Sequence, residues 1–206
     1  GLARLGLKVS WVSRVGDDSF GHFVLDSLKK EGIDASGVTL DARYPTGFQL
    51  KSKVENGTDP TVEYFRKGSA ASHLSKEDFR AGCFSIARHL HLSGVAAALS
   101  HTSYELLEHA ATAMKAAGKT LSFDPNLRPS LWKSEAEMVE KLNRLAFQAD
   151  WVLPGLKEGV ILTGEKTPEG IADFYLRRGV KAVVIKTGAD GAWFRTADGE
   201  EGAVAA

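Results

Sequence analysis

Apolar, strand-like runs alternate with helical segments along most of this chain, and that alternation restricts the possible folds more than any other feature. Strands are predicted at 7–16, 89–94, 120–124, 150–154, 180–188 and 191–195. Helices are predicted at 18–32, from 75 onward, at 100–117, at 134–148 and at 167–179. Because strands that alternate with helices form βαβ units, we predict an α/β fold with a mostly parallel sheet flanked by helices.

Polar residues mark the starts of several of these helices. Ser134 and Glu137 have the spacing of a capping box, and Ser75 and Asp78 are placed as caps of the helix that SKEDF opens. Pro168 stands at a first helical position, where its missing N–H leaves no bond unmade. These caps support helices at the three places.

The segment 38–71 departs from this alternation, because it has β-rich runs and no helical period. FQLKSKV and TVEYFRK straddle ENGTDP and predict a β-hairpin. We interpret Asn56-Gly57-Thr58 as part of the hairpin turn rather than as a glycosylation site. We therefore predict an α/β core formed by 1–37 and 72–206, with 38–71 inserted as a small β-sheet lid.

The charge balance argues against some classes of partner. Lys plus Arg number 26 and Asp plus Glu number 26, so the formal net charge is zero. This disfavours a nucleic-acid binder and gives no attraction to anionic membranes. Cys83 is the only cysteine, and no apolar run reaches the ~18–20 residues of a membrane-spanning helix. We expect no nucleic-acid or membrane partner and a cytoplasmic location.

The stretch FDPNLRPSLW (123–132) ends a predicted strand with three polar side chains, Asp124, Asn126 and Arg128. Its two prolines disfavour a helix there. One interpretation is a stiff capped turn, and the other is a ligand site. Ligands of open α/β sheets bind at the carboxyl ends of strands. We therefore expect this stretch to meet the other strand ends, at Val95, at Pro154–Glu158 and at Lys186–Gly188.

Three further groups each allow a functional and a structural interpretation. KTGADG (186–191) is either a phosphate-binding loop or a β-turn between strands. Tyr64 and Arg66 share one face of a strand, which suits a hydroxylated anionic ligand or a solvated surface. Glu158 is either a magnesium residue acting through water or a first-turn helix acid. His89 and His91 alternate on a strand and are interpreted as structural.

Segments in the same order along the whole chain resemble the ribokinase-like (PfkB) carbohydrate kinases, and among them the 2-keto-3-deoxygluconate kinases. The resemblance is carried by GLARLGLKVSWVSRVGDDSFG, YPTGFQL, YFRKGSAASHL, LHLSGVAAALS, FDPNLRPSLW, DWVLPGLKEGVILTG and VVIKTGADGAWF. It implies a ribokinase-like fold with a β lid. It also implies phosphorylation, by ATP, of the terminal 6-hydroxyl of 2-keto-3-deoxygluconate or a similar sugar acid.

The resemblance also implies roles for individual residues. The implied substrate-binding residues are Gln49, Tyr64, Phe65, Arg66, Val95 and Arg128. The implied nucleotide-binding residues are Asn126, Leu127, Arg128, Lys186, Thr187, Gly188, Ala189, Asp190 and Gly191. Glu158 is implied to bind Mg²⁺ through water, although Gly155 stands where the family has asparagine. ATP and Mg²⁺ are the implied cofactors, with a monovalent cation such as K⁺ as a further candidate.

Parts of the family pattern are absent from these 206 residues. A Gly-Gly…Asn segment is expected before Gly1, and a Gly-Ala-Gly-Asp anion hole with the catalytic aspartate is expected after Ala206. GLARLG looks like the end of a helix, and GEEGAVAA contains no predicted packed element. We therefore expect a piece of a longer protein, with no catalytic residue in this chain and no activity by itself.

Two other functions and one assembly remain open. The chain could belong to a kinase for another sugar, such as fructose, ribose or a nucleoside. It could also be a non-catalytic sugar- or nucleotide-binding fragment. Since hairpin edges and apolar faces favour association, we expect a homodimer formed through residues 38–67.

Overall fold

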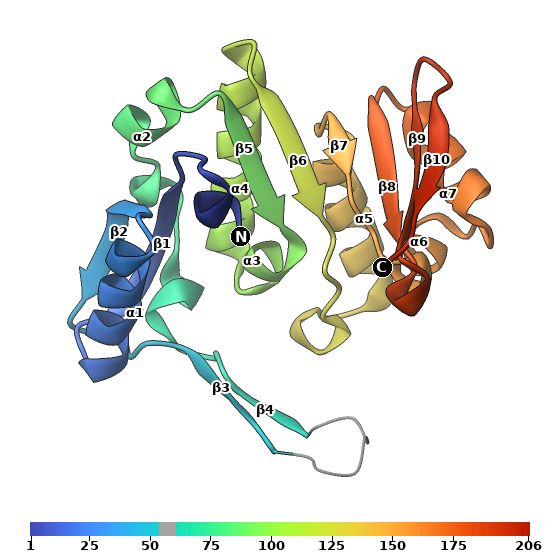
Figure 1. Cartoon of the computed structure of the whole chain (residues 1–206). Coiled ribbons are helices and arrows are strands. Elements are labelled where there is room, and N and C mark those ends of the chain that lie inside the picture. The colour runs from blue at the N-terminus through green and yellow to red at the C-terminus, as the bar shows by residue number, and fades with distance from the viewer. Residues whose placement is uncertain (54–60) are drawn as a thin grey trace. The chain divides into compact units, whose positions relative to one another are not determined.

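The chain divides at Ile86 into two units, Gly1–Ile86 and Ala87–Ala206. The computed structural model in Figure 1 describes residues 1–53 and 61–206. The predicted turn at Asn56-Gly57-Thr58 lies outside the described residues. In the described part of the chain, no helix has both the length and the apolar character needed to span a bilayer. Each unit is described by itself.

The first unit is built on a short parallel strand pair connected through a helix. Its strands and helices are β1 (Ser10–Gly16), α1 (Ser19–Lys30), β2 (Asp34–Asp41), β3 (Phe48–Lys51), β4 (Val62–Phe65) and α2 (Ala81–Ile86), with 3-10 turns at Leu2–Leu5, Ala70–His73 and Lys76–Asp78. β1 and β2 pair in parallel. Since β2 extends to Asp41, the first residues of 38–71 pair with β1, and the boundaries predicted for the lid stay a prediction.

Asp18 fixes the base of the hairpin to helix α1. As the N-cap of α1, its carboxylate accepts a hydrogen bond from the Gly21 amide at 2.8 Å. The same carboxylate accepts bonds from the amide and the hydroxyl of Thr46, each at 2.8 Å. The bonds from Thr46 and Gly21 lower the pKa of Asp18 below its ordinary value. One side chain therefore sets both the start of a helix and the entry to β3.

The predicted hairpin is confirmed, because β3 and β4 pair antiparallel with Phe48 opposite Phe65 and Gln49 opposite Tyr64. Figure 1 draws it as a two-stranded ribbon. Strand alternation puts Phe48 and Phe65 on one face and Gln49 and Tyr64 on the other. The two phenylalanine rings stack with centroids 4.7 Å apart. The hairpin therefore has an aromatic face and a polar face.

The second unit is a six-stranded sheet in the order β10-β9-β8-β7-β6-β5. Its strands are β5 (His89–Ser93), β6 (Thr120–Asp124), β7 (Trp151–Val152), β8 (Ala182–Lys186), β9 (Ala192–Thr196) and β10 (Glu201–Val204). Its helices are α3 (Gly94–Ala98), α4 (His101–Ala116), α5 (Glu135–Ala146), α6 (Leu156–Thr163) and α7 (Pro168–Leu176), with 3-10 turns at Pro129–Leu131 and Gly188–Asp190. β5 to β8 are parallel and the last two strands are antiparallel, so the predicted mostly parallel sheet is confirmed.

One face of this sheet forms the core. Fully buried side chains alternate along β6, β7 and β8, at Leu121, Phe123, Val152, Val183 and Ile185. Figure 1 shows α4 and α5 on one side of the sheet. The opposite face carries more polar side chains, since Ser122 and Asp124 alternate with the buried residues of β6. Burial of one face fixes the register, because a one-residue slip would expose the core set.

Three local predictions need correction. GEEGAVAA was expected to hold no packed element, yet Glu201–Val204 forms β10 against β9. The prolines of FDPNLRPSLW do not exclude all helical turns, because Pro129 stands first in a 3-10 turn. SKEDF forms only the turn Lys76–Asp78, in which the Asp78 carboxylate accepts a bond from the Ser75 amide at 2.9 Å, and α2 begins later at Ala81.

Candidate functional site

Four segments of the second unit meet where its parallel strands end. The amide of Lys186, at the end of β8, donates to the carbonyl of Pro154 at 2.9 Å. The Leu127 amide, after β6, donates to Glu158 at the start of α6 at 2.7 Å. A Cβ on Gly94, after β5, would overlap the carbonyl oxygen of Pro125. The predicted convergence of these strand ends is confirmed.

The backbone of 124–128, which follows β6, is fixed at successive residues. Asp124 accepts a bond from the Asn126 amide at 3.2 Å. Asn126 has a φ of 39°, which is uncommon for a residue other than glycine and is tolerated best by asparagine and aspartate. Close contact with Gly94 restrains Pro125 from the other side. The loop is therefore held by its surroundings before any ligand binds.

Glu158 connects this loop to helix α6. One carboxylate oxygen accepts a bond from Leu127 at 2.7 Å, and the other accepts a bond from the Gly155 amide at 2.7 Å. Gly155 is the N-cap of α6, so Glu158 is also a first-turn acid favoured by the helix dipole. Both interpretations of this residue thus involve the same half-buried carboxylate.

The same geometry bears on Mg²⁺. Among the described residues, no group of three or more His, Cys, Asp or Glu side chains could hold a metal. Mg²⁺ in kinase sites usually keeps several waters and uses one or two carboxylates with substrate phosphates. A carboxylate already bonded to two amides fits a contact through water better than direct coordination. The carboxylate of Glu158 therefore fits the predicted contact with Mg²⁺ through water.

Lys186 and Asp124 form an ion pair between the ends of β8 and β6. The Lys186 ammonium lies 2.9 Å from both carboxylate oxygens. The two side chains are 46% and 26% exposed. Lys186 was assigned to the nucleotide and Asp124 was named only as a polar group of its own loop, so the pairing between them was missed. Its signal in the sequence is that Asp124 ends the predicted strand 120–124 and Lys186 lies close to the end of the predicted strand 180–188.

Arg128 leaves the loop with unused hydrogen-bonding capacity. Its Nη1 donates to the Leu127 carbonyl at 2.6 Å. Its Nε is buried and has no hydrogen-bond partner within residues 1–53 and 61–206, and the same holds for the indole nitrogen of Trp132. A buried donor without a partner is uncommon in native proteins. Trp132 had no assigned role.

KTGADG forms a tight turn between β8 and β9. The Thr187 amide donates to the Gly191 carbonyl at 2.9 Å, and the Gly191 amide donates to the Gly188 carbonyl at 3.1 Å. Gly191 has a φ of 93°, and a Cβ there would overlap the carbonyl oxygen of Val204 on β10. Ala189 and Asp190 are exposed at the tip of the turn. The turn is confirmed, and phosphate binding by it stays a prediction.

The other predicted substrate residues divide between the units. In the first unit, the Arg66 guanidinium stacks over the Tyr64 ring at 4.1 Å and donates to Gln49 at 3.3 Å, so these three form one cluster. Phe65 points to the opposite, aromatic face of the hairpin. In the second unit, Val95 is half-buried near the start of α3, where its amide donates to Ser93 at 3.4 Å.

The two strand histidines are engaged in structural hydrogen bonds. His89 contacts the hydroxyls of Thr120 and Ser122, each at 2.8 Å, and His91 contacts Ser122 at 2.8 Å. The His89 ring also stacks on Trp151 with centroids 5.0 Å apart. Burial lowers the pKa of both histidines. The structural interpretation of this pair is confirmed.

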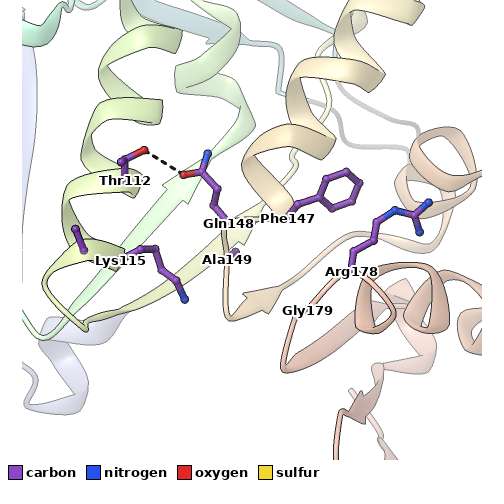
Figure 2. Close-up of a pocket in the computed structure, with 8 residues that line it drawn as sticks. Thr112, Lys115, Phe147, Gln148, Ala149, Arg178 and Gly179 are labelled. Atoms are coloured by element: carbon purple, nitrogen blue, oxygen red, sulfur yellow. Dashed lines mark hydrogen bonds between the residues drawn. The ribbon is translucent and has the colours of Figure 1, made fainter.

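A cavity of about 520 Å³ lies at the other ends of the strands. Figure 2 shows its residues, which come from the carboxyl ends of helices α4, α5 and α7. Lys115 in its wall is paired with the buried Asp150 at 3.0 Å, and the Arg178 guanidinium lies over Phe174 at 3.7 Å. Its two cations are thus engaged with the protein. The strand-end cluster, rather than this cavity, is the candidate site.

Comparisons with known proteins agree with the sequence patterns. A family model described as pfkB family carbohydrate kinase matches residues 1–206. The chain is 52% identical over 201 residues to the 2-dehydro-3-deoxygluconokinase of Bacillus subtilis (strain 168), covering 97% of this chain and 62% of that protein. The chain therefore spans less than two thirds of the length of that relative.

Solved structures have the same fold. The PfkB protein from Polaromonas sp. JS666 superposes with a TM-score of 0.94 at 52% identity, over 100% of this chain and 69% of that one. A fructokinase from Vibrio cholerae O395, solved with fructose, ADP and calcium ion bound, gives a TM-score of 0.85 at 28% identity, over 99% of this chain and 65% of that one. The ribokinase-like fold is thus confirmed.

Proposed function

Because this chain belongs to the PfkB family of carbohydrate kinases, we propose that the protein containing it phosphorylates the terminal 6-hydroxyl of 2-keto-3-deoxygluconate, or a similar sugar acid, with ATP. The Bacillus relative is named for the same sugar acid, since 2-dehydro and 2-keto describe one carbonyl. The observation that carries the proposal is the buried, unpartnered Nε of Arg128 on a fixed loop.

Arg128 suits a carboxylate because its guanidinium is a planar fork of donors. In the described part of the chain, no acidic side chain pairs with it, and only Nη1 has a partner. A sugar carboxylate would pair with the donors that the guanidinium leaves unused once the Arg128 side chain turns toward it. Arg66 is proposed as a second substrate arginine, held by Tyr64 and Gln49. The backbone of Phe65 and the side chain of Val95 are proposed as further sugar contacts.

The remaining predicted residues are proposed to hold the nucleotide. Asn126, Leu127 and the turn from Lys186 to Gly191 would face ATP, and Glu158 would contact Mg²⁺ through water. When bound, Mg²⁺ would neutralise phosphate charge during transfer. Pro125 and the hydrogen bonds of the 124–128 loop would orient the ligands, because a fixed loop loses little entropy on binding. A catalytic aspartate beyond Ala206, a K⁺ site and a cytoplasmic location stay predictions.

We also propose that two copies pair through the hairpin. On its aromatic face, Phe65 is 46% exposed and Leu50 is 54% exposed. Phe20 of α1 is 57% exposed, and its ring stacks on Phe48 with centroids 5.3 Å apart. A contiguous apolar surface of this kind typically marks a protein interface.

The full-length protein that contains this chain provides the test. Its kcat/KM with ATP and Mg²⁺ should be higher for 2-keto-3-deoxygluconate than for fructose or ribose by about 10²-fold, since a neutral sugar leaves the arginines unpaired. A preference for a neutral sugar would instead support a kinase for that sugar. Tight binding of ATP and sugar by calorimetry, with no turnover, would support a non-catalytic binding protein.

A further inference from the structure

We propose that Lys186 and Asp124 act together as a positioning pair, which sets the shape of the 124–128 loop for the sugar acid. The proposal rests on the proposed function for its ligand. It changes the expected role of Lys186, which would act on the sugar loop through Asp124 instead of serving mainly as a ligand of ATP.

The backbone of Lys186 is held in place by its neighbours. Its amide donates to the Pro154 carbonyl at 2.9 Å, and Gly155 forms an isolated parallel bridge with it. The end of β8 is therefore tied to the residues that open α6. A side chain that starts from such a fixed backbone can fix another element.

The Lys186 side chain contacts both oxygens of the Asp124 carboxylate. The ammonium lies 2.9 Å from each carboxylate oxygen, so it restrains the rotation of the carboxylate as well as its position. The pair is partly exposed, and pairs of this kind contribute little to overall stability. We therefore expect the ion pair to affect the geometry of the 124–128 loop rather than the free energy of unfolding.

Asp124 in turn holds the backbone turn that precedes Arg128. Its Oδ1 accepts the bond from the Asn126 amide at 3.2 Å, at the residue with a φ of 39°. Rotation of the carboxylate would remove that bond and release Asn126 from its uncommon conformation. Arg128 follows two residues later, so the direction of its guanidinium depends on this turn.

The same ion pair limits how Lys186 could contact the phosphates of ATP. Two oxygens of Asp124 already neutralise the Lys186 charge. A phosphate would have to compete with them or share the remaining donor of the ammonium. The 187–191 turn carries the exposed Asp190, and its Thr187 and Gly191 amides already bond to carbonyls within the turn. Lys186 is thus better suited to holding Asp124 than to binding phosphate.

The test is a double-mutant cycle in the full-length protein, with Lys186→Met, Asp124→Asn and both together. Dissociation constants for 2-keto-3-deoxygluconate and for ATP are measured separately by calorimetry. Each single change should weaken sugar-acid binding roughly 10-fold, and the double change should be no worse than either, because coupled residues are not additive. Lys186→Arg should restore most of the affinity, and the exposed Lys166→Met is the matched control.

A second readout needs no ligand. Hydrogen exchange at the amides of Asn126 and Leu127 should become faster in Lys186→Met and Asp124→Asn, and stay unchanged in Lys166→Met. If Lys186→Met weakened ATP binding alone and left exchange unchanged, the positioning role would be wrong. If the unaltered protein bound no sugar acid but the exchange result held, the proposed function would fail while the positioning pair would stand.

Discussion

One carboxylate oxygen of Glu158 lies 2.7 Å from the amide nitrogen of Leu127, and the other lies 2.7 Å from the amide nitrogen of Gly155. The side chain therefore joins the loop after β6 to the start of α6. A residue selected only for metal binding would not need these two bonds. They indicate that Glu158 shapes the site even without Mg²⁺.

Glu158→Gln tests this structural role. Glutamine keeps one acceptor oxygen and turns an amino group toward the other amide, so the free energy of unfolding should fall by about 1–3 kcal/mol. Urea unfolding in EDTA measures the change without metal. The matched control is Glu169→Gln, at an exposed first-turn position of α7. Equal stability of the two variants in EDTA would leave Glu158 with a metal role only.

Gly94→Ala tests the contact between the end of β5 and the loop. A Cβ at Gly94 would overlap the backbone carbonyl of Pro125, which cannot rotate away as a flexible side chain could. The displacement should cost about 1–3 kcal/mol in the free energy of unfolding. Gly82→Ala in α2 is the control, because nothing lies within 4 Å of its added Cβ. That control should be neutral or slightly stabilising.

The hydrogen bonds of the two strand histidines predict their tautomers. Thr120 donates its hydroxyl to the Arg88 carbonyl, so it accepts from His89 Nδ1. His89 Nε2 then accepts from Ser122, and Ser122 accepts from His91 Nδ1. Both neutral rings should therefore carry their proton on Nδ1. Nitrogen chemical shifts measured by NMR at pH 8 report which ring nitrogen carries the proton. A proton on Nε2 of either ring would contradict this chain of hydrogen bonds.

Protonation of these histidines should destabilise the fold. Burial lowers the pKa of both in the folded state, so the unfolded chain binds protons more readily. Their contribution is fully present above the ordinary histidine pKa of about 6.5 and is lost as pH falls below it. Urea unfolding between pH 8 and pH 5 should show a smaller loss in the His89→Gln/His91→Gln variant. The exposed His101→Gln should behave like the unaltered protein.

Arg128→Ala should lower kcat/KM for the sugar acid on the order of 10²-fold, because a charge-assisted contact typically contributes ~2–3 kcal/mol. Arg128→Lys should recover only part of this, since an ammonium cannot form the planar fork. The exposed Arg177→Ala, in the same unit, is the control. An unchanged value for Arg128→Ala on the full-length protein would remove Arg128 from the substrate site.

Leu50→Asp should weaken the proposed dimer. It puts a charge on the aromatic face of the hairpin, where burial of an unpaired carboxylate is costly. Lys51→Asp, on the opposite face of the same strand, is the control. Sedimentation of the full-length protein should show a dimer for the control and more monomer for Leu50→Asp. A monomer in the unaltered protein at micromolar concentration would contradict the proposal.

Local patterns were enough to predict the sheet and the meeting of its strand ends. Ser134 caps α5 as expected, by accepting a bond from the Glu137 amide, and Pro168 opens α7 as expected, because such starts depend on neighbours in the sequence. The capping box is incomplete: in the described part of the chain the Ser134 amide donates no return bond to Glu137, and the Glu137 carboxylate pairs with Lys141 at 2.7 Å.

Other features depend on contacts between distant residues. Lys186 and Asp124 are 62 positions apart, and no local pattern joins them. Strand β2 begins at Asp34 and includes Gly37, which local propensity disfavours, but pairing with β1 outweighs that preference. β10 had a usable signal, because Asp198-Gly199 between β9 and β10 is a typical hairpin turn.

The overlap that a Cβ on Gly191 would make with Val204 limits where this protein can be shortened. The turn that follows β8 rests directly on β10 as well as on the two strands that it joins. Removal of 201–206 would leave 1–200 with its sheet pairs from β5 to β9 but without the strand that backs the turn. A shortened form used for ligand screening should therefore retain β10, since its loss would change the very loop being screened.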